Sequence, residues 1–399
     1  MPDTYDAPNL YDAIVLGLGA MGAAATYQLA KCGAKVLGVD QYAPPHEFGS
    51  THGDTRVTRV ACGEGPEYSV FAARSHQIWR ELEAELGMDL FTQNGLLVLF
   101  GPGKRAANHS VADFRGATVD AAKKAKLDYE ILDTAQIRQR YPAFNVADGD
   151  EAYHDDVGGF VRPERCVTAQ LQKAKALGAD LHLNETVISF DQAGGSVTVK
   201  TDKDTYHAKE LIVAAGSWLP DFLKPALAGQ FKVTRQVLYW FRAKGAMEHA
   251  QFSPERFPVY IWQVPAPQPI YGFPATGGLE EGVKLATEQD HTTTTPETVA
   301  RAVGPDEIRE MYETYVGPYF PGLSPTCVKH KVCLYTQVDR ARFIIDRHPD
   351  ADRVIVASPC SGHGFKHSAG IGELLAQMAL REKHQDIARF AFGYAPQPA

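Results

Sequence analysis

The sequence has few cysteines, and none of them stands in a pair with metal-binding or redox spacing. The six cysteines are scattered along 399 residues and form no C-x-x-C pair. This usage argues against a disulfide framework and a zinc site, and it is typical of a reducing compartment. We therefore expect a cytoplasmic protein without a bound metal.

Long apolar runs and an excess of positive charge are also missing. No run approaches the ~18 residues that a membrane span requires, and the first residues, Met-Pro-Asp-Thr-Tyr-Asp, are too polar for a signal peptide. The formal net charge is −8, whereas a nucleic-acid footprint needs clustered Lys and Arg. We expect neither a membrane nor a nucleic acid among the partners.

The remaining composition is that of an ordinary globular protein. Hydrophobic residues make up 44% and charged residues 22% of the chain. A chain of 399 residues can form one large domain or two interleaved domains with an ample core.

The most informative stretch lies near the N-terminus. A short apolar run, Ala13–Leu16, predicts a strand that is buried on both faces. Gly17, Gly19 and Gly22 follow with G-x-G-x-x-G spacing, and an alanine-rich helix is expected over residues 20–32. The first glycine allows a tight turn, the second lets a pyrophosphate approach the backbone, and the third lets helix and strand pack closely.

A second strand follows this helix and ends in an acidic residue. The run Lys35–Val39 predicts the strand, and Asp40 follows it, where a carboxylate would hydrogen-bond a ribose hydroxyl. This stretch has every part of a dinucleotide-binding unit in the expected order and spacing: a strand, a glycine turn, a helix, a second strand and an acidic residue. The stretch therefore predicts a dinucleotide site rather than only a tightly packed turn, without distinguishing FAD from NAD.

The rest of the chain alternates helices and strands around a β-rich insert. From residue 233 to about 335 the composition shifts to aromatic, β-prone segments and proline loops, which indicates an antiparallel domain inserted into the dinucleotide fold. Periodicity and breakers predict helices over 68–86, 163–177 and 368–380, and strands over 96–100, 181–183, 187–190, 197–199, 210–215 and 354–358. Residues 103–150 read as polar helix and loop.

Six motifs in a fixed order resemble one known family. They are Gly17-x-Gly19-x-x-Gly22, His52-Gly-Asp-Thr-Arg56-x-x-Arg59, Ala215-Gly-Ser-Trp218, Tyr271-Gly-Phe-Pro, Cys333-Leu-Tyr335 and Ser361-Gly-His-Gly-Phe-Lys366. Together they resemble the monomeric sarcosine oxidase and N-methyltryptophan oxidase family of flavin enzymes. The resemblance runs from about residue 12 to residue 380.

The resemblance implies the fold class and a division of the chain. We expect an α/β protein, in which an FAD-binding Rossmann-like domain of glutathione-reductase type is interleaved with an α+β substrate domain of mainly antiparallel sheet. The FAD-binding domain would comprise residues 1–91, 154–231 and 340–399. The substrate domain would comprise residues 92–153 and 232–339, with its sheet over the flavin.

The resemblance also implies residues that hold the flavin. Gly362 and Gly364 would let the backbone approach the ring, and the helix that follows would direct its positive end towards it. Cys333 matches the cysteine that bonds covalently to the flavin, although a buried strand cysteine is the plain alternative. Cys360 lies nearer the glycine-rich turn and is a weaker candidate.

Residues on one short segment would lie close to the flavin ring. By resemblance, Arg56 stacks or pairs beneath the ring and His52 lies near it. The alternative is a loop capped by polar residues.

Several basic and aromatic residues match the family's catalytic positions. Arg59 and Lys366 match a clamp for the substrate carboxylate, and Lys366 would also lie near the flavin. Lys284 matches the lysine that promotes the reaction with O2, because a buried cation favours electron transfer to oxygen. Tyr271 and Tyr335 would line the substrate cavity. Structural ion pairs, a solvated strand lysine and core aromatics are the alternatives.

One position departs from the family pattern. Four residues after Lys284 the sarcosine oxidases carry a histidine that touches the substrate, whereas this chain has Glu288. A carboxylate there would favour a cationic or hydroxylated substrate group. The identity of the amine therefore stays open.

We expect a monomeric FAD-dependent oxidase of N-methyl or other secondary amino acids. The substrate would become an imine, and O2 would become H2O2. The rivals are an oxidase of a cyclic imino acid or a fructosyl amino acid, a dehydrogenase with another electron acceptor, and a flavin-binding protein without catalysis.

Overall fold

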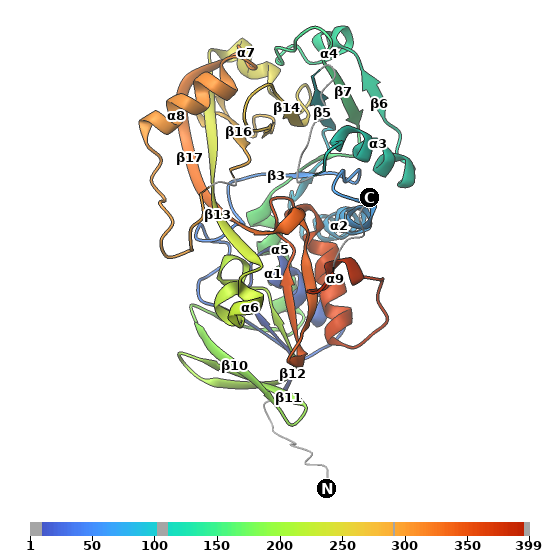
Figure 1. Cartoon of the computed structure of the whole chain (residues 1–399), viewed down its shortest axis with the longest axis vertical. Coiled ribbons are helices and arrows are strands. Elements are labelled where there is room, and N and C mark those ends of the chain that lie inside the picture. Colours follow the sequence, from blue (N-terminus) through green and yellow to red (C-terminus); the bar gives the residue numbers. More distant parts are fainter. Residues whose placement is uncertain (1–9, 102–110, 290–291, 395–399) are drawn as a thin grey trace.

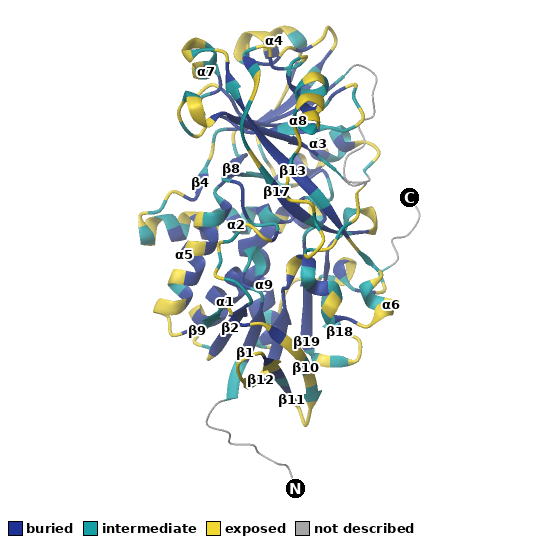
Figure 2. Cartoon of the chain, turned by 90° about the vertical axis from the view of Figure 1, so that its left-hand side faces the viewer, coloured by how far each residue is buried: buried dark blue, intermediate teal, exposed yellow. Residues whose placement is uncertain are grey.

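Two large sheets, one above the other, make up most of the protein (Figure 1). This computed structural model describes residues 10–101, 111–289 and 292–394. A small sheet of three strands lies between the two large ones (Figures 1 and 2). Figure 2 shows that the buried residues concentrate on both large sheets and on the helices that cover the lower one.

The lower sheet has eight strands around a parallel core. Strand β1 (Leu10–Leu16) lies at its centre, with β2 (Val36–Asp40) on one side and β12 (Thr205–Val213) on the other, all parallel. The other strands are β9 (Asp180–Leu183), parallel to β2, β19 (Ala351–Ser358), parallel to β12, and the antiparallel β10 (Val187–Ala193), β11 (Ser196–Thr201) and β18 (Ile344–His348). A parallel sheet of this kind must be covered by helices.

Four helices pack together beside this sheet and share its largest core. They are α1 (Ala20–Lys31), α2 (Pro66–Leu86), α5 (Pro163–Ala176) and α9 (Ser368–Ala379). Small residues let α1 and α9 approach closely, because a Cβ at Gly372 would collide with Ala24. The first and last helices of the fold are thereby packed against each other.

The turn between β1 and α1 needs glycine for a steric reason. Gly17 has a φ of +85°, and a Cβ there would lie 2.6 Å from the carbonyl oxygen of Ala214, at the end of the neighbouring strand β12. Both the conformation and the space exclude a larger residue. The G-x-G-x-x-G spacing therefore forms the strand-turn-helix unit that the sequence predicts.

The upper sheet also has eight strands, and all but one of its neighbouring pairs are antiparallel. Its core is rich in aromatic residues, among them Phe144, Phe257 and Trp262. In order across the sheet the strands are β17 (Leu323–Val338), β13 (Phe231–Ala243), β16 (Val283–Thr287), β15 (Ile270–Gly272), β14 (Val259–Gln263), β5 (Leu96–Phe100), β7 (Glu151–Asp155) and β6 (Glu130–Leu132).

Two long strands connect the upper and lower parts of the molecule. In Figure 1, β13 and β17 run from the upper sheet down towards the lower one. They pair along their length, from Ala243 with Leu323 to Phe231 with Val338. Because Cys333 and Tyr335 lie on the lower half of β17, the pairing carries them to the region between the sheets.

The smaller elements fill the space around these sheets. The three-stranded sheet consists of β3 (Arg56–Thr58), β8 (Gly159–Val161) and β4 (Phe91–Thr92). The remaining α-helices of the described residues are α3 (Phe114–Lys124), α4 (Thr134–Arg140), α6 (Pro225–Ala228), α7 (Ala246–Gln251) and α8 (Pro305–Met311). In the described part of the chain, no helix combines the length and apolarity needed to cross a membrane.

The pattern-based element predictions are largely confirmed, with one correction. The helix expected over 20–32 is Ala20–Lys31, and the one expected over 368–380 is Ser368–Ala379. Residues 103–110 lie outside the described residues, and over 111–150 the reading as helix and loop misses strand β6. Two of its three residues are exposed, so no alternation of apolar residues marks the strand.

The close contact between α1 and α9 makes Gly372 a sensitive position. We expect Gly372→Ala to lower the free energy of unfolding by about 1–3 kcal/mol, because the added methyl group overpacks the helix contact. Gly393→Ala is the control, since nothing lies within 4 Å of a Cβ at Gly393, and we expect it to change stability by less than about 0.5 kcal/mol. Denaturant unfolding measures both, and an unchanged Gly372→Ala variant would contradict the packing argument.

Candidate functional site

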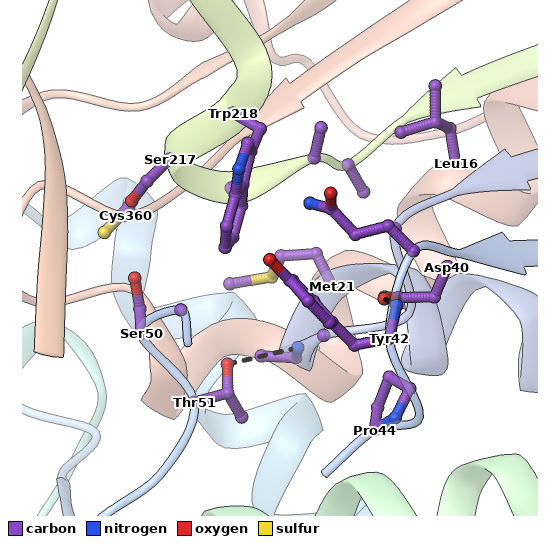
Figure 3. A pocket seen from close by; sticks show the side chains of 18 of the residues that line it. Leu16, Met21, Asp40, Tyr42, Pro44, Ser50, Thr51, Ser217, Trp218 and Cys360 are labelled. Carbon is purple, nitrogen blue, oxygen red and sulfur yellow. Dashed lines mark hydrogen bonds between the residues drawn. The ribbon is translucent and has the colours of Figure 1, made fainter. Parts of the chain in front are cut away.

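A cavity of about 400 Å³ begins at the turn between β1 and α1. Its lining includes Gly17, Gly19 and Asp40 from the first strand-helix-strand unit, and Cys360, Gly362 and Gly364 from the segment after β19. Figure 3 shows Asp40 and Cys360 at opposite sides of the view, with Trp218 and Tyr42 between them. The cavity therefore joins the first strand-helix-strand unit to the glycine-rich segment before α9.

The acidic residue at the end of β2 is buried and oriented by the backbone. The Asp40 carboxylate accepts hydrogen bonds from the N–H groups of Leu18, at 2.7 Å, and Tyr42, at 2.8 Å. Burial raises the pKa of this carboxyl group, and the two backbone hydrogen bonds oppose the rise. Each carboxylate oxygen keeps lone-pair capacity for a further donor on the cavity side.

Two further features of the cavity wall fit a bound dinucleotide. Helix α1 has Gly19 at its N-cap, which offers no capping side chain, and the Ala20 N–H donates to Thr51 Oγ1 at 3.4 Å (Figure 3). The other N–H groups of the first turn suit an anion. The hydroxyl of Ser358 lines the cavity and is buried, with no hydrogen-bond partner among the described residues. A buried polar group of this kind fits the wall of a site for a polar ligand.

A smaller cavity of about 80 Å³ adjoins the larger one. Arg56, Tyr335, Gly362 and Phe365 line both cavities, so the two share a wall. The other polar residues that line the smaller cavity are Arg59, Glu64, Tyr271, Glu288, His363 and Lys366. A small molecule in this cavity would lie against the part of the dinucleotide nearest Gly362.

Arg59 and Lys366, the two residues expected to clamp a substrate carboxylate, both lie against the carboxylate of Glu64. Arg59 Nη2 donates to both oxygens of Glu64, at 2.7 and 2.8 Å, and Arg59 Nη1 donates to the Ala61 carbonyl at 2.6 Å. Lys366 Nζ lies 3.6 Å from the same carboxylate and donates to the His363 carbonyl at 2.7 Å. All three charged side chains are buried. Burial lowers the pKa of Lys366, while Glu64 opposes the change.

The two tyrosines expected in the substrate cavity meet on its wall. The phenol oxygens of Tyr271 and Tyr335 lie 3.3 Å apart. Burial raises the pKa of both phenols, so both stay protonated at neutral pH. Glu288, which follows β16, lines the same cavity and further raises both pKa values by its charge.

His52 and Arg56 lie on either side of a tight turn beside the cavities. His52 is buried, and burial together with the nearby charge of Arg56 lowers its pKa to about 3. Its imidazole is therefore neutral at physiological pH. Arg56 lines both cavities, and its guanidinium donates to the carbonyls of Thr55, at 2.8 Å, and Ser50, at 2.7 Å.

Lys284 lies behind this turn and is not among the residues that line either cavity. It is buried, and its Nζ donates to the carbonyls of Gly53, at 2.6 Å, and Thr55, at 2.7 Å. Its ammonium group also faces the rings of Phe273 and Trp240, at 4.5 and 5.4 Å from the ring centres. Burial lowers the pKa of Lys284 well below its usual value.

The two candidate cysteines occupy different positions. Cys333 is fully buried on β17 and is not among the cavity-lining residues, whereas Cys360 lines the larger cavity. Burial raises the pKa of the Cys333 thiol, while the charges of Arg56 and Lys284 oppose the rise. Cys360 Sγ accepts a hydrogen bond from the Thr336 N–H at 3.3 Å.

Two acidic residues of the site escaped the motif comparison. Glu64 precedes helix α2, and Glu164 stands in the first turn of α5, where its carboxylate accepts hydrogen bonds from Gly53 and Asp54. Glu64 precedes a helix that begins with proline, and Glu164 lies in the first turn of another. Acidic residues are common at the start of helices because they stabilise the helix N-terminus, so the sequence alone does not mark either residue as part of a site. Within the described ranges, no group of three or more His, Cys, Asp or Glu residues could hold a metal ion.

Comparison with known proteins gives one family and several close relatives. The model of a family described as FAD dependent oxidoreductase matches residues 12–378. A monomeric sarcosine oxidase from Bacillus sp. is 38% identical over 386 residues, which cover 96% of this chain and 95% of that protein. An N-methyl-L-tryptophan oxidase from Yersinia pestis is 31% identical over 387 residues, which cover 96% and 99%.

Solved structures agree with the fold. The structure of NikD, described as an unusual amino acid oxidase essential for nikkomycin biosynthesis, aligns with a TM-score of 0.80 at 24% identity. The alignment covers 96% of this chain and 97% of NikD. The arrangement of sheets and helices described above is therefore shared with NikD.

The Glu64 carboxylate balances two buried cations, so its removal is expected to be costly. We expect Glu64→Ala to lower the free energy of unfolding by about 3–5 kcal/mol, because Arg59 and Lys366 lose their shared counter-charge. Acetate, a small carboxylate, should restore part of this loss by binding between the two cations. Thermal unfolding with acetate or chloride added at equal ionic strength measures the effect.

Glu81→Ala is the matched control, since Glu81 bridges Arg74 and Lys31 at the half-exposed surface. We expect it to cost less than about 1 kcal/mol and to show no acetate effect. Equal stabilisation of both variants by acetate would argue against a carboxylate site at Arg59.

Proposed function

The chain belongs to the family of FAD-dependent oxidoreductases, and we propose that it is an oxidase of N-methyl or other secondary amino acids. One observation carries the proposal: two buried basic side chains, Arg59 and Lys366, line a small cavity that shares a wall with the larger one. The cations suit the carboxylate of an amino acid. The names of the relatives supply the class of amine.

The larger cavity suits FAD. The N–H groups at the start of α1 would bind the diphosphate, and Asp40 would accept hydrogen bonds from a ribose. Gly362 and Gly364 would lie against the flavin end. FAD held there would supply the acceptor for a hydride equivalent from the carbon next to the amine nitrogen, and the carrier of two electrons to the final acceptor.

The small cavity would hold the substrate by its carboxylate. Arg59 offers a planar fork and Lys366 a point charge, and both already bind the Glu64 carboxylate. A substrate carboxylate would replace Glu64 there. Tyr271 and Tyr335 would contact the rest of the substrate as hydrogen-bond donors, because burial keeps both phenols protonated.

Lys284 would promote the reaction with oxygen. When protonated, it would place a buried positive charge behind the turn that leads to Arg56. Such a charge stabilises the negative charge that O2 gains as it is reduced. We propose that O2 is the acceptor and that H2O2 is released, while the substrate leaves as an imine that water hydrolyses. We further propose that the protein is a cytoplasmic monomer.

A second candidate function differs only in the amine. Glu288 lines the substrate cavity at a position where the sarcosine oxidases resembled by the sequence carry a histidine. Its carboxylate favours a substrate with a cationic or hydroxylated group, such as a fructosyl amino acid. A fructosamine oxidase of Aspergillus fumigatus shares the fold, with a TM-score of 0.74 at 16% identity.

The oxidase proposal is tested by mixing the holoprotein with a panel of N-methyl, cyclic and fructosyl amino acids. We expect anaerobic bleaching of the flavin by at least one of them, and peroxide release in air. Arg59→Met and Lys366→Met should each raise KM about 10- to 100-fold, since each loses a hydrogen bond to a charged group. Arg74→Met, which removes a surface ion pair with Glu373, should leave KM unchanged.

Two outcomes would redirect the assignment. Bleaching without peroxide release would mean a dehydrogenase with another acceptor. A yellow protein that no amine bleaches would mean a flavin-binding protein without catalysis.

We propose that the flavin is covalently attached through Cys333, and acid precipitation tests this. The yellow colour should stay in the pellet of the wild type and of Cys360→Ser, and should be released from Cys333→Ser. Cys360 is the necessary comparison because it lines the larger cavity and Cys333 does not. Retention by Cys333→Ser and loss by Cys360→Ser would assign the attachment to Cys360. Release from the wild type would exclude a covalent bond.

A further inference from the structure

The short turn Gly53–Thr55 lies between two charged side chains from different parts of the fold. On one side, Oε1 of Glu164, in the first turn of α5, accepts hydrogen bonds from the N–H groups of Gly53, at 2.5 Å, and Asp54, at 3.1 Å. On the other side, Nζ of Lys284 donates to the carbonyl oxygens of Gly53 and Thr55. The turn therefore joins Glu164 to Lys284 through its peptide groups.

The backbone of this turn is strained. Gly53 has a φ of +98° and Asp54 a φ of +70°, so two consecutive residues lie in the left-handed region. The Thr55 N–H donates to the Gly53 carbonyl at 2.8 Å, which closes a three-residue γ-turn of the rare form with positive φ. A turn of this kind persists only where its surroundings hold it.

The surroundings hold the turn on every side that the structure describes. A Cβ at Gly53 would lie 2.5 Å from Leu238 Cδ1, so the turn is packed against β13. The Asp54 carboxylate pairs with Lys329 of β17 at 2.5 Å. Glu164 provides the acceptor for both N–H groups that point away from Lys284. Strain of this kind, next to a candidate site, points to a role in positioning.

The turn lies between two residues that the sequence places near the flavin by resemblance. His52 precedes it, and Arg56, which lines both cavities, follows it. Lys284 Nζ has three acceptors in reach, namely the two carbonyls and Thr55 Oγ1 at 3.3 Å, and all belong to this turn. If the turn relaxed, Lys284 would lose these acceptors and Arg56 would shift with it.

We propose that Glu164 is a positioning residue, which holds the Gly53–Thr55 turn so that its carbonyls fix Lys284 and its C-terminal end fixes Arg56. This inference rests on the oxygen role proposed for Lys284. The N–H groups of Gly53 and Asp54 both donate to the same oxygen of Glu164. The turn is therefore held by two hydrogen bonds to one acceptor oxygen, which does not require a charged carboxylate. A glutamine, which keeps an acceptor oxygen in the same place, should therefore replace Glu164.

The first measurement needs no catalysis. Amide hydrogen exchange of a peptide that covers residues 50–58 is followed in the holoprotein. We expect the Gly53 and Asp54 amides to exchange at least tenfold faster in Glu164→Ala than in the wild type. Glu164→Gln should exchange within about threefold of the wild type. Equal protection in all three proteins would overturn the proposal.

The second measurement isolates the reaction with oxygen from the reaction with the amine. The flavin is reduced photochemically, and its reoxidation by O2 is followed in a stopped-flow instrument. We expect Glu164→Ala to slow reoxidation at least tenfold and Glu164→Gln to slow it less than threefold. Should Glu164→Gln be as slow as Glu164→Ala, the charge and not the hydrogen bonds would matter, and the positioning role would be wrong.

Two further variants separate the possible failures. Glu67→Ala is the matched control, because helix α2 also begins with Pro-Glu and Glu67 pairs with Arg389, not with the turn. The flavin of Glu67→Ala should reoxidise within twofold of the wild-type rate. If Glu67→Ala slowed reoxidation as much as Glu164→Ala does, the loss of an acidic residue at a helix start would explain both effects, and the positioning role would be wrong. Lys284→Met should be at least as slow as Glu164→Ala. If Lys284→Met reoxidises normally, the proposed oxygen role fails, and the exchange data alone decide whether Glu164 holds the turn.

Discussion

Burying basic side chains between two sheets is the constraint on which the rest of this structure depends. Arg59, Lys284 and Lys366 are each at most 4% exposed. Taking a cation out of water costs several kcal/mol unless hydrogen bonds and an opposite charge replace the water. The fold provides substitutes for the lost water in two ways. Carbonyl groups of one strained turn bind Lys284, while a single carboxylate, Glu64, serves both Arg59 and Lys366.

The local parts of this fold follow from the sequence because they depend on short-range rules. The glycine spacing after residue 16 needs only a tight turn and a close helix, and Gly17 has the positive φ that such a turn requires. Helix α2 ends just before Gly87 and α5 just before Leu177 and Gly178, and both glycines have the positive φ that is common after a helix. The upper sheet is different. The pairing of β13 with β17 joins residues about 100 positions apart, and no local pattern encodes that register.

The candidate site, like the fold, combines features that the sequence predicts with features that it does not. Arg59 and Lys366 could be paired in advance only by resemblance to a family, and the structure does bring them together. Their partner Glu64 could not be found in that way, because an acidic residue before a helix is common in any protein. Glu164 escaped for the same reason. Glu64 contacts Arg59 nearby in the sequence, but its contact with Lys366 and the contacts of Glu164 with Gly53 and Asp54 join distant segments. Such long-range contacts appear only once the chain is folded.

The charge arrangement bears on how the proposed substrate would bind. Arg59 and Lys366 share the carboxylate of Glu64, so these two cations and one anion keep an excess of positive charge when both basic groups are protonated. Under the proposed function, an amino acid would exchange its own carboxylate for that of Glu64, and the desolvation cost of the two cations would already have been met by folding. The net gain from the carboxylate would then be small. Discrimination between amines would therefore depend on the other polar residues that line the same cavity, Tyr271, Tyr335 and Glu288.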